Sequence, residues 1–142
     1  MRQIPSIIVI VLATVAATGC GGSGQSEADK AKSQACDASS DIKAQVATLS
    51  NLPLSTSSVD TAKTSLQKID TDLKTISDAA PKVSDNLRSE LEAANATFTT
   101  EVQQATEAIT SAQSLSGAAT AVAAAGSTLQ ASYEKAFANV SC

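Results

Sequence analysis

Apolar residues recur at steps of three and four along most of the chain after its first 25 residues, and this is the period of one face of an α-helix. Pro53, Pro81 and the pair Ser116-Gly117 interrupt the pattern. Each interruption predicts a helix end, because residues before a proline avoid the helical region and glycine punctuates helices. The pattern therefore predicts four helices, at about residues 27–51, 57–78, 82–114 and 118–140.

The scarcity of large side chains restricts how these helices can pack. Aromatic residues make up 2% of the chain, and it has no Trp and no His, so a core must be built from Ala, Leu, Ile and Val. These side chains bury little area each unless the helices approach closely. We therefore predict an all-α fold, an antiparallel up-down-up-down four-helix bundle with coiled-coil-like packing over residues 26–142.

Two cysteines distinguish this fold from an alternative in which Pro81 only kinks one long rod made of the second and third helices. With four antiparallel helices, Cys36 near the start of the first and Cys142 after the last lie at the same end of the bundle. With three helices they lie at opposite ends. Reflecting position 36 through the predicted turns brings it within about one residue of the level of Cys142. Since a disulfide needs Cα atoms within roughly 6 Å, we predict four helices and a Cys36–Cys142 bond.

The first residues of the chain have the layout of a secretory signal. Arg2 precedes an apolar run from Ile4 to Ala17, and small residues and a cysteine follow. The segment Ala17-Thr18-Gly19-Cys20 resembles the lipobox of bacterial lipoproteins, in which the cysteine is acylated on its thiol and becomes the first residue of the mature chain. The resemblance implies that the protein is held to a cell membrane by lipid.

By this resemblance, residues 1–19 form a signal peptide, Cys20 carries the lipid, including palmitate, and residues 20–25 form a flexible Gly/Ser tether. An uncleaved transmembrane anchor is the alternative, because about 17 apolar residues are the lower limit for crossing a bilayer. Pro5 and the lack of a basic cluster after the tether disfavour it, since positive charge stops translocation. Both interpretations place the helical domain outside the cytoplasm.

The residue types present argue against several classes of function. Without histidine the commonest general base and metal ligand is missing, and no serine lies in a Gly-x-Ser-x-Gly motif, so we expect no enzyme, no cofactor and no metal site. A net charge of −4 disfavours nucleic-acid binding. Three carboxylate pairs lack the loop that calcium sites need and are interpreted as solvated helix surface: Asp37/Asp41, Asp70/Asp72 and Glu90/Glu92.

Two functions of different classes remain. The first is a structural or interaction module of the cell envelope, which binds an envelope protein or a cell-wall polymer. The second is a carrier that holds a small apolar ligand or a lipid between its helices. Because ligand pockets are usually lined with hydrophobic and aromatic side chains, and this chain has one Tyr and two Phe, the first function is favoured.

The same register makes two predictions about apolar residues. Phe98 on the third helix is expected to meet Tyr133 and Phe137 on the fourth, and to form the one cluster of large side chains in the core. Residues 108–124 are expected to project about 15 Å past the shorter first and second helices. No charge lies between Glu107 and Glu134, so this tip predicts an exposed partner-binding patch formed by Ile109, Leu115 and Val122.

Overall fold

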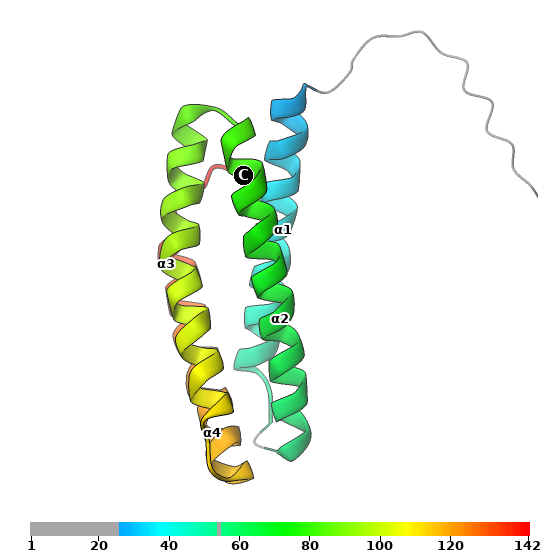
Figure 1. Cartoon of the computed structure of the whole chain (residues 1–142), viewed down its shortest axis with the longest axis vertical. Helices are drawn as coiled ribbons and strands as arrows, with labels where there is room; N and C mark the ends of the chain where they lie inside the picture. Colours follow the sequence, from blue (N-terminus) through cyan, green and yellow to red (C-terminus); the bar gives the residue numbers. More distant parts are fainter. Residues whose placement is uncertain (1–25, 54) are drawn as a thin grey trace, which may run out of the picture.

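The computed structural model describes residues 26–53 and 55–142, and these form an antiparallel four-helix bundle (Figure 1). All the regular structure in this part of the chain is helical, as predicted. The helices are α1 (Glu27–Ser50), α2 (Thr56–Ala79), α3 (Asp85–Thr110) and α4 (Leu115–Ala136), and a short 3-10 helix, η1 (Ala80–Lys82), follows α2.

The boundaries around α3 and α4 differ from the predicted ones. We predicted a third helix from about residue 82, but Pro81 and Lys82 lie in η1, and an extended residue at Val83 precedes the start of α3 at Asp85. The hydroxyl of Ser114 accepts a hydrogen bond of 3.0 Å from the Gly117 amide. Ser114 thereby caps α4, so Ser116-Gly117 belongs to the first turn of this helix instead of ending the one before.

The last helix both begins and ends earlier than predicted. It ends at Ala136, and residues 137–142 form a turn followed by irregular chain. The backbone amide of Val140 donates to Phe137, and that of Cys142 donates to Val140. The end of the described chain is thus a compact tail that leads from α4 back toward α1.

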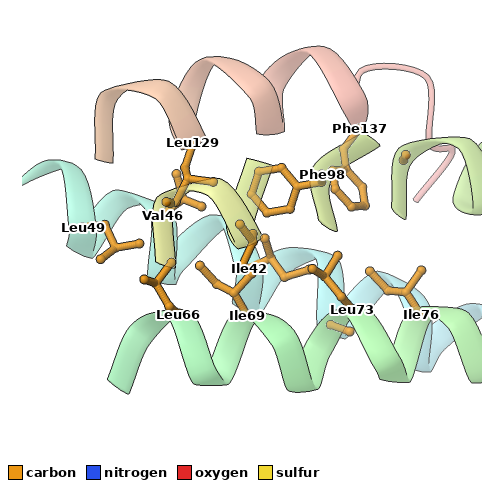
Figure 2. Close-up of a cluster of buried hydrophobic side chains, with 14 of the residues drawn as sticks. Ile42, Val46, Leu49, Leu66, Ile69, Leu73, Ile76, Phe98, Leu129 and Phe137 are labelled. Atoms are coloured by element: carbon orange, nitrogen blue, oxygen red, sulfur yellow. The ribbon is translucent and has the colours of Figure 1, made fainter. Parts of the chain in front are cut away.

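One continuous apolar core runs along the bundle. Figure 2 shows Ile42 from α1, Leu73 from α2 and Phe98 from α3 pointing into a common interior. The largest fully buried side chains are Phe98, Ile42, Leu49, Ile69, Ile76, Leu91, Leu129 and Val122. Small residues on the same stripes, such as Ala35 and Ala62, are completely buried as well. The core is therefore filled by aliphatic side chains from closely packed helices, as the composition requires.

Candidate functional site

A disulfide joins Cys36 on α1 to Cys142 in the tail after α4, with the two Cα atoms 5.6 Å apart. The predicted pairing is confirmed, and with it the even number of helices. The bond spans 106 positions in sequence. In the chain-entropy model, closing a loop of this size stabilises the folded state by about 4 to 5 kcal/mol.

The three aromatic residues meet as predicted. Phe98 contacts Tyr133 and Phe137 edge to face, with ring centroids 5.8 and 6.0 Å apart, while Tyr133 and Phe137 stack at 4.7 Å. Phe98 is fully buried and lies beside Phe137 in Figure 2. The cluster joins the middle of α3 to the end of α4.

Tyr133 also connects α4 to α1. Its hydroxyl donates a 2.8 Å hydrogen bond to the backbone carbonyl of Ser39. The Tyr133 oxygen is also 2.9 Å from the Ser39 hydroxyl. Because the tyrosine proton is already used, the serine hydroxyl is the donor of this second bond. The pair satisfies the polar end of the one tyrosine while its ring lies in the apolar cluster.

Gly126 sets the distance between α1 and α4. A Cβ atom built at this position would lie 2.7 Å from the Leu49 carbonyl oxygen and 2.8 Å from the Ser50 Cα. Both are backbone atoms, which cannot move aside as a flexible side chain can. The absence of a side chain at position 126 therefore permits the close approach of the two helices.

The predicted partner-binding patch at the tip is wrong for two of its three residues. Ile109 is 3% exposed and Val122 is 1% exposed, and both belong to the main core. Leu115 alone is exposed, at 61%. One accessible leucine does not make an apolar surface, because singly exposed apolar residues are ordinary on protein surfaces.

The correction follows from an offset between α1 and α2. The contact of Gly126 with the end of α1 shows that about three turns of α4 extend past α1. The chain then continues beyond Ser50 before α2 begins, so the first turns of α2 lie next to this extension (Figure 1). Buried Val59 and Ala62 on α2 share the core with Val122. We expected α1 and α2 to end at one level, and this assumption left the tip uncovered.

A groove with a volume of about 900 Å³ lies between α2 and α3. Its floor consists of Leu66, Val102 and Ile109, each at most 5% exposed. The walls are polar and carry Lys63, Gln67 and Asp70 from α2 and Gln103, Thr106 and Glu107 from α3. The groove thus offers both charges and side-chain amides around a narrow apolar strip.

Two carboxylates that are distant in the sequence lie close together in the structure. Asp41 on α1 and Asp72 on α2 line a common groove with Lys68. Burial raises the pKa of Asp72, the neighbouring Asp41 carboxylate raises it further, and Lys68 partly offsets both. Within residues 26–53 and 55–142, no group of three or more Asp, Glu, His or Cys side chains is placed to hold a metal ion.

We interpreted Glu90 on α3, with Glu92, as solvated helix surface, and this is wrong for Glu90, which is half-buried. Its Oε2 atom is buried and has no hydrogen-bond partner among the described residues. It lines a cavity of about 360 Å³ together with Lys32 on α1 and Ser141 in the tail. No feature of the helical period separates Glu90 from the exposed carboxylates, because its burial depends on how α1 and the tail pack against α3.

The signal peptide, the lipidated Cys20 and the tether were predicted for residues 1–25, which lie outside the described residues. None of the described helices combines the length and the hydropathy needed to cross a bilayer. No protein-family model, curated protein or solved structure matches this chain.

Proposed function

We propose that this protein is a lipoprotein, held through Cys20 to a cell membrane and facing outside the cytoplasm, at the cell surface or in the periplasm. Its bundle acts as a structural or interaction module of the envelope. The observation that carries the proposal is the Cys36–Cys142 disulfide. Structural disulfides form and persist in oxidising compartments outside the cytoplasm. A paired Cys36 and Cys142 agree with the lipobox-like segment, in which Cys20 has a different use.

The packing of the described residues supports a binding module more than a carrier. The core between the helices is filled by side chains such as Ile42, Phe98 and Leu129, each fully buried. The carrier alternative is favoured by one feature, the groove between α2 and α3 with its apolar floor. An envelope protein or a cell-wall polymer remains the proposed partner of the polar surface.

Substitution of the acylated cysteine tests the anchor. We expect full-length Cys20→Ala, expressed in a bacterium, to lose radiolabelled palmitate. It should then either leave the detergent phase on phase separation or accumulate as an unprocessed precursor that is larger than the wild type. Cys36→Ala is the matched control, because it removes a cysteine that carries no lipid and leaves partitioning unchanged. If the wild type carries no palmitate, and Cys20→Ala has the same size as the wild type and partitions with detergent as it does, the lipoprotein proposal is wrong and a transmembrane anchor takes its place.

The choice between module and carrier is tested with the Cys20→Ala chain, which carries no lipid on residue 20. Native mass spectrometry of this chain, purified without added lipid, is expected to show the mass of the polypeptide alone. A lipid of defined mass that co-purifies in a one-to-one ratio would instead identify a carrier.

A further inference from the structure

The α1–α4 interface is held by interactions that resist separation along its whole length. The Cys36–Cys142 disulfide lies at one end, and the Tyr133 hydrogen bond to Ser39 follows three residues further along α1. Toward the other end, Gly126 packs directly on the backbone of α1. Covalent, hydrogen-bonded and backbone contacts therefore follow one another along the two helices.

The α2–α3 interface contains no such link among the described residues. Its ion pairs lie within one helix each, Lys74 with Asp70 in α2 and Arg88 with Asp85 in α3. The wall hydroxyls behave likewise, since Thr71 and Thr106 donate to carbonyls of their own helices. α2 and α3 also contact one another less extensively than α1 and α4 do. Apolar contacts below the 900 Å³ groove hold this interface together.

Among the described residues, side-chain hydrogen bonds restrain the α2–α3 interface only at its end next to η1. There the Arg88 guanidinium donates hydrogen bonds of 3.3 Å to the carbonyls of Ala80 and Pro81. The groove residues Lys63 and Thr110 lie away from η1, toward the first residue of α2 and at the last residue of α3. Any separation of α2 from α3 is therefore widest at the groove and closes toward η1.

We propose that the bundle opens along the α2–α3 interface, as two hairpins that turn about the α1–α4 interface, and exposes Leu66, Val102 and Ile109. The open form is a minor state in equilibrium with the closed bundle. Opening at the groove disrupts apolar contacts of α2 with α3 and α4, which are non-directional, and leaves the Arg88 hydrogen bonds next to η1 in place. Opening between α1 and α4 would instead break the Tyr133 hydrogen bond to Ser39 and is restrained by the disulfide. The proposal does not depend on the lipid at Cys20.

Thiol labelling of two matched variants tests the opening. Val102→Cys places a thiol on the floor of the groove, and Val46→Cys places one on the core side of α1, where Figure 2 shows Val46. Both valines are at most 5% exposed and lie inside helices. Each variant is made in the full-length Cys20→Ala chain with the native disulfide oxidised, so the introduced thiol is the reactive one. The probe is 5,5′-dithiobis(2-nitrobenzoate), and its reaction rate is followed against urea.

We expect Val102→Cys to react at least about tenfold faster than Val46→Cys in the absence of urea, because local opening reaches it without global unfolding. Its rate should rise with urea by a slope well below that of global unfolding, since the slope scales with the surface exposed. Equal rates and equal slopes for the two thiols would overturn the proposal. A slope of zero at Val102→Cys would overturn it too, because the thiol would then be reached in the closed bundle.

Removal of the disulfide provides a second measurement. In a Cys36→Ser/Cys142→Ser background, the α1–α4 interface loses its covalent link, so the labelling rate of Val46→Cys should rise by a larger factor than that of Val102→Cys. An equal rise at both positions would mean that the disulfide stabilises the whole bundle without acting as a hinge, and would contradict the proposal. Urea denaturation of each variant confirms that the rates refer to folded protein.

Discussion

The α1–α4 and α2–α3 interfaces bury the same kinds of aliphatic side chain, yet they differ in their specific contacts. The first carries a disulfide, a tyrosine hydrogen bond and a glycine contact. The second carries a groove with polar walls that bond within their own helices. Because apolar burial is non-directional, it does not by itself decide where a bundle is rigid. The disulfide, the tyrosine hydrogen bond and the glycine contact restrain the α1–α4 interface, and the α2–α3 interface lacks contacts of this kind along the groove.

The largest expected effect comes from removing the disulfide that restrains the α1–α4 interface. Cys36→Ser/Cys142→Ser should lower the free energy of unfolding by about 4 to 5 kcal/mol, because the unfolded chain regains the freedom of a loop of about a hundred residues. Urea denaturation followed by circular dichroism measures the change, with oxidised wild type as reference. If the free energy of unfolding falls by less than about 1 kcal/mol, the disulfide does not contribute to the difference between the α1–α4 and α2–α3 interfaces.

The aromatic cluster beside Tyr133 is the next test. Phe98→Ala should lower the free energy of unfolding by about 3 to 5 kcal/mol, because it leaves a cavity in the one part of the core built from large rings. The same urea denaturation measures it. Leu115→Ala is the control, since Leu115 is 61% exposed and its loss should change stability by less than about 0.5 kcal/mol. Similar losses in the two variants would mean that the cluster does not support the interface.

Gly126 and Gly117, both in α4, form a matched pair for the close helix contact. Gly126→Ala should destabilise the bundle by about 1 to 3 kcal/mol, because the new Cβ overlaps backbone atoms of α1. Gly117→Ala gains helix propensity, and its new Cβ meets only side-chain atoms, the Ser114 hydroxyl at 3.0 Å and the Ala112 Cβ at 3.8 Å, so its effect should be smaller. Thermal unfolding monitored at 222 nm compares the two. A neutral Gly126→Ala variant would show that α1 and α4 can separate slightly without cost.

The smallest effect is expected at Asp72, in the groove between α1 and α2. Its pKa is raised above the usual 3.8, chiefly by burial and then by Asp41, so ionisation disfavours the folded state. The contribution of Asp72 to stability is therefore fully present below its pKa in the unfolded chain, and it is lost as pH rises through its pKa in the folded protein. Asp72→Asn should be slightly more stable than wild type at pH 7 and lose this part of the pH dependence. Urea denaturation between pH 3 and pH 7 measures it, and an unchanged profile would contradict the assignment.

The predictions that succeeded concern quantities that can be counted along the chain. The period of apolar residues identified the four helices, and the positions of Cys36 and Cys142 required an even number of them. The same counting brought Phe98 to Tyr133 and Phe137. Each follows from the constant rise of an α-helix, which converts a difference in residue number into a distance along the bundle.

The partner-binding patch failed because it depended on the ends of the helices instead of their period. Ile109 and Val122 are on core stripes, but their exposure depended on where α2 begins relative to the end of α1. Loop and cap geometry decide such offsets, as with the extended residue at Val83 and the cap at Ser114. These local conformations have no periodic signature, so counting residues does not reveal them.

The sequence by itself determined that this chain forms a disulfide-closed bundle of four helices. The helical period, and the even number of helices that the two cysteines require, do not change when a predicted loop is misplaced by a few residues. Only the tertiary structure decided that Asp41 meets Asp72, that Gly126 lies against α1 and that the groove lies between α2 and α3. Each of these features depends on the rotation and axial offset of one helix against another. A shift of a single turn, about 5.4 Å, leaves the apolar stripes facing inward but changes every neighbour across the interface.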